Sequence, residues 1–392
     1  MVTVTVAVQY PEGDLLKTRR HLSAEEDERL RHIEAFVQER LRKPSLEAWN
    51  EERFLAEALP SLADLGLGGL EIDGTSRLFK GLAHAAVAQA DVSMSAVLGI
   101  HNELIVGLIH AYGSAEQKEA WLGRLSRFEA LGAFCLTEPD HGSDIAGGLA
   151  TTARREGDSW VINGTKRWIG MATIADIALI WARDVADDAI KCFLVETNTP
   201  GYHAEMIRHK MGLRGIPNAD VVLEDLRVPA EAKLPGARSF ADTNVLLCSS
   251  RAWVGWQAVG LQHAVLDVVR TYVTDREQFG RPLASFQLIQ QAIAEISGNL
   301  TATQALMTQI TALQQEGQLE MVHAAAAKAT ATRLARASAA LGREALGGNG
   351  ITTDYEVAKL MGDAEAIYTY EGSYGINSLI VGRALTGVSA FV

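Results

Sequence analysis

A single glutamate, Glu371, stands where a carboxylate could act as a general base. It follows Tyr370 and precedes two small residues, Gly372 and Ser373. Apolar residues then recur at helical spacing, which predicts that Ser373 caps a helix and that Glu371 lies in a loop just outside it. In a dry pocket such a group can accept a proton, because desolvation raises the pKa of a carboxyl towards the working pH. The alternative is an acid that only complements the helix dipole, and this stretch alone favours that alternative.

A second candidate segment is the polar run FCLTEPDHGSD at residues 134–144. Thr137 and Ser143 supply hydroxyl groups and Gly142 supplies a permissive backbone, a combination suited to wrapping a polar ring edge and a phosphate. The same residues also fit a plain turn, which Pro139 favours.

Three further features allow both a functional and a structural interpretation. Trp168 could shield a planar cofactor, although a tryptophan on a strand is more often part of a core. Arg276, at the predicted end of a helix, could bind a phosphate or complement the helix dipole. The glycine-rich run 345–350 could admit a pyrophosphate or simply end a helix.

Other reactive residues argue against several chemistries. His101, His110 and His141 show no metal-ligand spacing, and neither HExxH nor GxSxG occurs. The glycines of residues 65–74 do not complete a dinucleotide fingerprint, because Glu71 stands where the third glycine belongs. We therefore expect no metal site, no serine hydrolase and no Rossmann domain.

Composition indicates an ordinary globular protein. The 392 residues suffice for two or three domains, and the formal charge of −12, from 36 basic and 48 acidic residues without a basic stripe, argues against a nucleic-acid partner. Three widely separated cysteines form no disulfide framework, which favours a reducing compartment. The sequence shows no secretory signal, no apolar run of membrane-spanning length and no peroxisomal tripeptide, so we expect a cytoplasmic protein.

The elements that must position these residues change character twice along the chain. Up to about residue 130, apolar residues recur at helical spacing, with capping boxes at Ser23 and Ser114. Short β-branched runs then predict a small antiparallel barrel or sandwich, in which Asn163-Gly164 is typical of a hairpin turn. Long helical patterns return after residue 237 and predict a four-helix bundle.

The predicted fold is therefore α+β and multidomain. An N-terminal helical domain covers residues 1–130, a middle β domain covers 131–236, and a C-terminal helical bundle covers 237–392.

Taken together and in this order, the motifs resemble those of the acyl-CoA dehydrogenase and acyl-CoA oxidase family, from about residue 20 to the C-terminus. The matching pieces are LTEPDHGSD (136–144), NGTKRWIG (163–170), KMGLRG (210–215), DREQFGRPLASFQ (275–287), LGGNG (346–350) and IYTYEGSYGIN (367–377). The WIG, the TYEG and SFADT (239–243) look closest to the branch of glutaryl-CoA dehydrogenase and plant short-chain acyl-CoA oxidase.

The resemblance implies a bound FAD and the α,β-desaturation of an acyl thioester, with Glu371 as the base and the β-hydrogen leaving as hydride to the flavin. It assigns cofactor contacts to Phe134, Leu136, Thr137, Gly142, Ser143, Trp168, Ile169, Gly170, Arg276, Phe279, Gln287, Leu346, Gly347, Gly348, Ser373 and Gly375. Arg276, Gln287 and the 345–349 loop match groups that reach the FAD of a neighbouring subunit, which implies a homotetramer or homodimer. It assigns substrate contacts to Ser143, Leu247, Arg251, Val254 and Gly372.

Several residues differ from the family pattern, and they bear on the cofactor contacts, the substrate and the base. Gly170 and Ser373 each stand where threonine is usual, and Gly375 replaces a polar residue. Residues 91–95 lack the arginine that a dicarboxylyl substrate needs, which disfavours glutaryl-CoA. The alternative base position of the isovaleryl branch corresponds to Ser250, which cannot serve as a base.

Three functions stay open at this point. The first is a dehydrogenase for a short or branched acyl-CoA that passes electrons to a flavoprotein acceptor. The second is an oxidase that passes them to O2, and the thioester carrier in either case is CoA or an acyl carrier protein. The third is a member without desaturase activity, either a monooxygenase or a scaffold, which an intact Glu371 disfavours.

Overall fold

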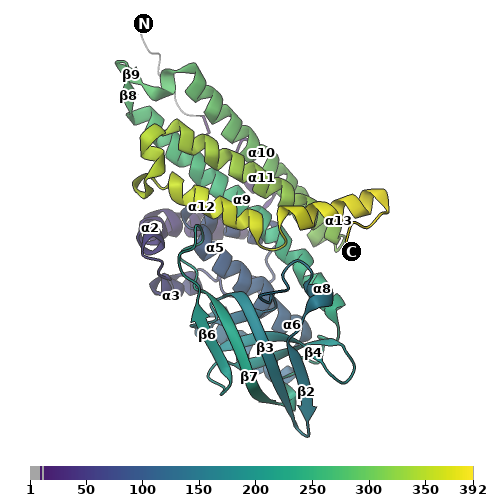
Figure 1. Ribbon diagram of the computed structural model, residues 1–392. Coiled ribbons are helices and arrows are strands. Elements are labelled where there is room, and N and C mark those ends of the chain that lie inside the picture. The colour runs from purple at the N-terminus through teal and green to yellow at the C-terminus, as the bar shows by residue number, and fades with distance from the viewer. Residues whose placement is uncertain (1–8, 11–12, 392) are drawn as a thin grey trace.

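The computed structural model describes residues 9–10 and 13–391 and has the expected α+β architecture. A curled sheet lies at one end of the molecule, long helices lie at the other, and the N-terminal helices pack between them (Figure 1). Most of the N-terminal stretch that argued against a secretory signal lies outside the described residues, as does the last residue of the C-terminal tripeptide.

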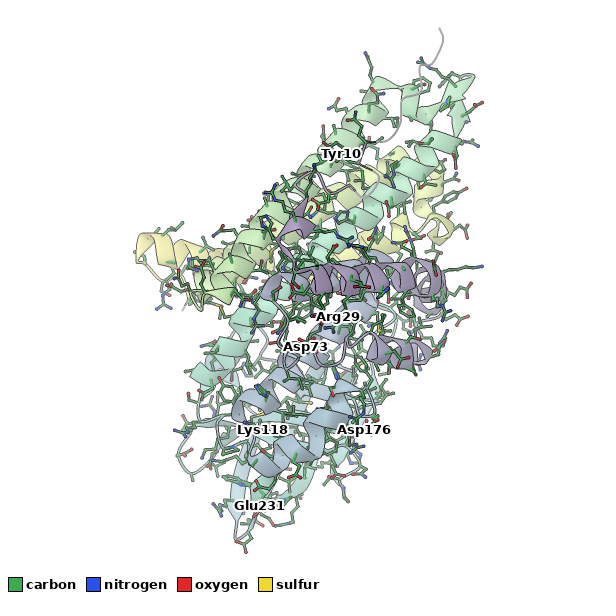
Figure 2. The ribbon with its side chains drawn as sticks, turned by 180° about the vertical axis from the view of Figure 1, so that it is seen from behind. Tyr10, Arg29, Asp73, Lys118, Asp176 and Glu231 are labelled. Carbon is green, nitrogen blue, oxygen red and sulfur yellow. The ribbon has the colours of Figure 1, made fainter. Side chains whose placement is uncertain are left out.

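The N-terminal region consists of short helices joined by tight connections. They are α1 (Ala24–Phe36), α2 (Arg42–Asn50), α3 (Leu59–Asp64), α4 (Arg77–Ala90), α5 (Val92–Gly99), α6 (Gly107–Tyr112) and α7 (Ala115–Ser126). The capping boxes predicted at Ser23 and Ser114 are confirmed. Arg29 of α1 pairs with Asp73 at 2.9 Å and so ties α1 to the loop before α4, as seen from behind in Figure 2.

Helices α5 and α6 are joined by a π-helical stretch, η4 (Ile100–Val106), into one helix from Val92 to Tyr112. Its 21 residues are long and apolar enough to cross a membrane, so the expectation that no apolar run reaches that length was wrong. Of its most apolar 18-residue window, 89% is buried inside the protein, as is typical of a core helix.

The middle region is a single mixed sheet. Its strands are β1 (Gly132–Cys135), β2 (Thr152–Glu156), β3 (Ser159–Gly170), β4 (Ile177–Asp184), β5 (Ile190–Glu196), β6 (Tyr202–Met206) and β7 (Asn218–Pro229). The order is β1-β4-β2-β3-β7-β6, with β5 also paired to β4. Two of the pairs, β1 with β4 and β2 with β4, are parallel, so the sheet is not purely antiparallel as expected. A short helix, α8 (Ile145–Gly148), interrupts the strands between β1 and β2.

The predicted hairpin turn at Asn163-Gly164 was wrong. Strand β3 runs straight through both residues, and its register against β7 shifts there, which is the geometry of a β-bulge. Gly164 has φ 151°, and the side chain of Asn163 exchanges hydrogen bonds with Asp225 on β7. The true hairpin lies earlier, where Gly157 (φ 60°) begins the two-residue loop between β2 and β3.

The C-terminal region is a helical bundle. It contains α9 (Phe240–Asp275), α10 (Gln287–Gln315), α11 (Met321–Ala345), α12 (Val357–Thr369) and α13 (Tyr374–Thr386), with a small hairpin, β8 (Glu277–Gln278) and β9 (Arg281–Pro282), between α9 and α10. Helices α9 to α12 pack together, and α13 extends from the bundle along the end of α11 (Figure 1).

Helix α4 and the α5–α6 helix pack closely on α9 because glycines make room for two indole rings. The ring of Trp253 fills the space beside Gly99, and that of Trp256 fills the space beside Gly81. A methyl group at either glycine would overlap the ring, since the added carbon at Gly99 would lie 2.6 Å from it. Both indoles are almost completely buried.

Candidate functional site

Glu371 lies in the short link between α12, which ends at Thr369, and α13, which begins at Tyr374. Its φ of 53° is left-handed, a conformation that strains a non-glycine residue unless its surroundings hold it. Ser373 accepts a hydrogen bond from the Ile376 N–H at 3.3 Å, so the predicted N-cap is confirmed.

The carboxylate of Glu371 accepts a hydrogen bond from the hydroxyl of Ser250 on α9, with 2.6 Å between Oγ and Oε2. Ser250 is fully buried and Glu371 is half-buried. The carbonyl oxygen of Leu247, 3.2 Å from the same hydroxyl, is its alternative acceptor. Ser250 cannot replace a base, but it is placed to orient one.

A buried lysine holds the backbone on both sides of Glu371. Lys328 Nζ donates to the carbonyl oxygens of Tyr368 and Gly372, at 3.0 and 2.8 Å. The side chain of Asn377 donates to the same Gly372 oxygen at 2.7 Å. Burial lowers the pKa of Lys328 to about 7. These contacts explain how the strained link keeps its shape.

Arg251 ties α9 to α13 beside this link. Its Nε donates to Asn377 Oδ1 at 3.0 Å and its Nη1 to the Leu247 carbonyl at 2.7 Å, while burial lowers its pKa. Gly372 has φ 80°, and an added Cβ would lie 3.1 Å from Asn377 Nδ2 and 3.2 Å from Arg251 Nη2, so a side chain there would be strained and crowded. Leu247, Arg251 and Val254 follow one another along two turns of α9, and Arg251 lies next to Gly372. Ser143 is exposed on a loop of the middle region.

A wall of aromatic rings extends inward from Glu371. The hydroxyl of Tyr370 donates to Gln257 Oε1, and the Tyr370 ring lies 5.9 Å from that of Trp253. The ring of His84 on α4 stacks on that of Trp253, with 6.0 Å between the two ring centres. Burial raises the pKa of Tyr370 well above its ordinary value.

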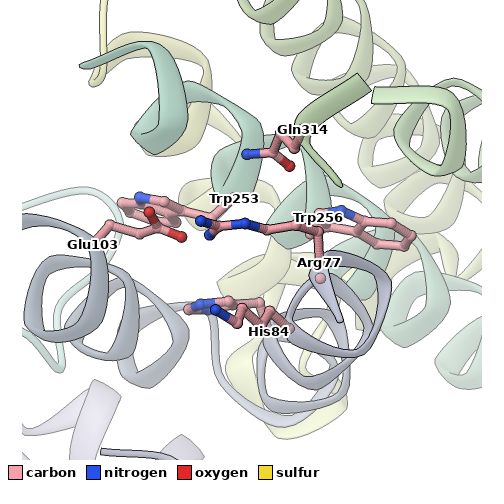
Figure 3. Close-up of a pocket in the computed structure, with 8 residues that line it drawn as sticks. Arg77, His84, Glu103, Trp253, Trp256 and Gln314 are labelled. Atoms are coloured by element: carbon pink, nitrogen blue, oxygen red, sulfur yellow. The ribbon is translucent and has the colours of Figure 1, made fainter. Parts of the chain in front are cut away.

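Beyond Trp253 lies a small polar chamber, drawn in Figure 3. Its volume is about 10 Å³, room for about one water molecule. It is lined by Arg77, Lys80, Gly81, His84, Glu103, Trp253, Trp256 and Gln314. The Arg77 side chain extends across the chamber towards Glu103 (Figure 3) and pairs with Glu71 at 2.9 Å.

Burial sets the protonation of this chamber. It raises the pKa of Glu103 to about 8 and lowers that of His84 to about 4, so both side chains are mainly neutral at pH 7. The chamber is not evident in the sequence because its lining comes from four separate helical stretches. The available signal was Glu103 itself, an acid within an apolar helical run.

The two segments expected along a flavin are brought together. The backbone N–H of Arg167 donates to the Thr137 carbonyl at 2.8 Å. Below them, Glu138 accepts from Lys166 Nζ at 2.8 Å and from the Thr151 N–H at 2.9 Å, and Lys166 is completely buried. This ion pair fixes the loop that carries Gly142 and Ser143, whereas Phe134 and Leu136 precede it on and just after β1.

Trp168 is not a core residue. Its side chain is 53% exposed at φ 64°, with the Arg167 guanidinium 5.0 Å from its ring centre. At Gly170 an added Cβ would lie 2.8 Å from Ile100 Cδ1, so the threonine that is usual there would require the Ile100 side chain to shift. The neighbouring Ile169 is buried.

The remaining predicted cofactor residues lie at the other end of the bundle. These are Arg276, Phe279, Gln287, Leu346, Gly347 and Gly348. Asn349 bonds to Tyr272 OH at 2.9 Å and so joins the glycine-rich loop to the end of α9. Arg276 follows Arg251 by roughly 35–40 Å along that helix, at 1.5 Å per residue. One chain does not bring the two groups of residues around one flavin.

Family models match all three regions of this chain. The N-terminal, middle and C-terminal domain models of acyl-CoA dehydrogenase match residues 23–129, 133–226 and 240–386. The chain therefore belongs to the acyl-CoA dehydrogenase family, and it is a flavoprotein oxidoreductase of that family with FAD as its cofactor.

Several individual proteins are similar over most of their length. The human mitochondrial short-chain specific acyl-CoA dehydrogenase is 32% identical over 342 residues, 84% of this chain and 82% of that protein. Isobutyryl-CoA dehydrogenase of Dictyostelium discoideum is 33% identical over 364 residues, 90% and 86% of the two chains. A glutaryl-CoA dehydrogenase from Mycobacterium smegmatis, solved in complex with FADH2, is 33% identical with a TM-score of 0.93 and covers 97% and 99% of the two chains.

The residues along the middle region fit an FAD. An exposed indole at Trp168 offers a flat apolar face, and the hydroxyls of Thr137 and Ser143 with the bare backbone of Gly142 offer hydrogen-bonding groups on an exposed loop. Ser373 and Gly375 at the start of α13 are partly or fully exposed near Glu371.

Proposed function

We propose that this protein catalyses the α,β-desaturation of a short or branched acyl thioester, with Glu371 as the base that removes the α-proton. The observation that carries the proposal is the setting of Glu371, whose carboxylate is held by Ser250 at 2.6 Å in a link fixed by Lys328 and beside a buried aromatic wall. The short-chain and isobutyryl-CoA dehydrogenases among the relatives support this substrate class.

In this proposal each group of the link has one task. The carboxylate takes the α-proton, and the thioester carbonyl must be polarised so that the enolate developing on the substrate is stabilised. We assign the backbone N–H of Glu371 as one donor to that carbonyl oxygen. Bound FAD supplies the hydride acceptor for the β-hydrogen.

The experiment is anaerobic mixing of the FAD-loaded protein with a series of acyl-CoAs while the visible flavin band is followed. We expect a short or branched acyl-CoA to bleach the band. Glu371→Gln should slow the bleaching by roughly 100- to 10,000-fold, because general base catalysis contributes on the order of 10² to 10⁴. Glu365→Gln is the matched control, since Glu365 is a carboxylate of α12 paired with Arg336 at 2.7 Å.

The same preparation identifies the carrier and the acceptor. If an acyl carrier protein thioester bleaches the flavin and no acyl-CoA does, the carrier of the substrate is an acyl carrier protein and not CoA. Rapid reoxidation with peroxide formation in air would make the protein an oxidase, and reoxidation by an electron-transfer flavoprotein would make it a dehydrogenase. A Glu371→Gln protein that bleaches at the native rate would refute the proposed base.

A further inference from the structure

Helix α9 leaves one direction for an acyl chain bound at Glu371. Near the start of the helix Asn244 and Val245 are exposed, whereas the turns after Arg251 are buried. A carrier as large as CoA cannot be buried, so it must lie towards the exposed start of the helix. The acyl chain then points the opposite way, towards Trp253.

The side chain of Trp253 blocks that path and has no free space to move into. It follows Ser250 by one turn of α9, a rise of roughly 4.5 Å. Its ring is packed against Tyr370 on one side and against Gly99 on the other, where even an added methyl carbon would lie 2.6 Å from the ring. With 3% of its surface exposed, the indole is fixed by its neighbours.

The space beyond Trp253 does not suit a hydrocarbon chain. Within the described part of the protein, three buried nitrogens that line the chamber have no hydrogen-bond partner: Trp253 Nε1, Trp256 Nε1 and His84 Nδ1. Arg77 and Glu103 face the same small volume. Alkyl groups that entered it would strip these polar groups of any water without satisfying them.

We propose that Trp253 is the floor of the acyl pocket and the residue that limits this protein to short acyl chains. The inference rests on the proposed function and adds the residue that sets the substrate. An acyl chain that reaches past the indole must displace a tightly packed ring and then enter a polar chamber. Both requirements disfavour long acyl chains.

The test compares butyryl-CoA with octanoyl-CoA as flavin reductants, using the FAD-loaded native protein and the Trp253→Val variant. In the native protein we expect kcat/KM for octanoyl-CoA to be at least tenfold below that for butyryl-CoA, as expected when added methylenes find no pocket. In Trp253→Val the ratio of octanoyl to butyryl should rise by at least roughly tenfold. An 8-hydroxyoctanoyl chain should gain more than octanoyl, because its hydroxyl can bond within the chamber.

Trp256→Val is the matched control. It removes an equally buried indole from the same helix and the same chamber, but leaves the floor in place, so its chain-length ratio should stay within about twofold of the native value. FAD content and thermal unfolding show whether each variant is folded. If Trp253→Val does not fold, Trp253→Phe, a smaller ring at the same place, should shift the ratio in the same direction.

Each failure has its own result. If the native protein is reduced by octanoyl-CoA as well as by butyryl-CoA, or if the folded Trp253 variants keep the native ratio, the floor is elsewhere and this inference is overturned. If no acyl thioester reduces the native flavin, the proposed function is overturned, and the assignment of Trp253 is withdrawn with it.

Discussion

At the scale of single residues, the site depends on how little freedom Glu371 has. Its backbone is left-handed, its flanking carbonyl oxygens are held by Lys328, and its carboxylate is held by Ser250. Because these groups are ordered before the substrate binds, the reaction step does not have to supply the entropic cost of orienting them. Ser250 therefore acts through Glu371 as a positioning residue.

We expect Ser250→Ala to lower the rate of flavin reduction by roughly 10- to 100-fold, the range of a hydrogen bond to a charged group. The affinity for butyryl-CoA should change little, because the hydroxyl contacts the base, and Ser250→Thr should restore most of the rate. Stopped-flow reduction at saturating and limiting substrate separates the two quantities. Ser249→Ala is the control, since that neighbouring hydroxyl bonds to Glu103 at 3.1 Å. An unchanged rate in Ser250→Ala would remove the positioning role.

The sequence could predict those parts of the site whose residues are close together along the chain. Glu371, Gly372 and Ser373 are consecutive, so their loop and cap could be predicted from local pattern. Ser250 is 121 positions away from Glu371, and no local pattern indicates that they meet. Trp168 could not be assigned to core or surface from sequence, because a bulge and a left-handed φ decide which way it faces.

At the scale of elements, α4, η4, α9 and α10 enclose an ionisable carboxyl group, that of Glu103, within the protein. Glu103 is almost fully buried, and its pKa is raised to about 8 by burial first and by the nearby Glu71 second. Between the ordinary pKa of 4.5 and about 8, the folded protein therefore holds a proton that the unfolded chain releases. This carboxyl makes the stability fall as pH rises through that window.

We expect Glu103→Gln to remove this dependence. The variant should match the native protein well below pH 4.5, where the carboxyl is neutral in both the folded and the unfolded state, and at pH 9 it should be more stable than the native protein by on the order of a few kcal/mol. Urea unfolding at pH 5, 7 and 9 measures the difference, with the exposed Glu28→Gln as the control. A stability difference that does not grow with pH would show that Glu103 is charged in the folded protein.

The elements differ in how well their patterns predict them. The long helices α9, α10 and α11 were predictable because their apolar spacing persists over many turns. Helix α12 was not among the predicted helices, although Val357, Leu360, Ala364 and Ile367 form its buried face. The Asn163-Gly164 pair misled because the same dipeptide serves hairpin turns and bulges, and only the pairing with β7 distinguishes them.

At the scale of the whole molecule, the surface carries large apolar side chains at the end of the bundle far from Glu371. Phe279 is 93% exposed at the tip of the β8–β9 hairpin, Leu288 is 79% exposed and Ile351 is 69% exposed. Such exposed side chains, gathered beside Arg276, are typical of a surface that another molecule covers. They agree with the expectation, drawn from the family resemblance, that this end reaches the FAD of a neighbouring subunit.

We expect Phe279→Asp to reduce the assembly from an oligomer to smaller species and to lower the retained FAD several-fold, because a charge cannot be buried there without a partner. Light scattering coupled to gel filtration and the flavin-to-protein absorbance ratio measure the two effects. Val185→Asp, which changes an apolar side chain 56% exposed in the middle region, should leave both unchanged. A Phe279→Asp protein with native mass and full flavin would argue against this arrangement.

The apolar helix from Val92 to Tyr112 has a consequence for synthesis on the ribosome. Helix α4 precedes it in the chain and packs on it, but α9, which also packs along it, begins only at Phe240, about 130 residues later. At an elongation rate of 5–20 residues per second, the helix waits on the order of 10 s before α9 exists. During this interval the face that α9 later covers is exposed on an apolar nascent segment, so a chaperone that binds apolar nascent chains should increase the yield of folded protein.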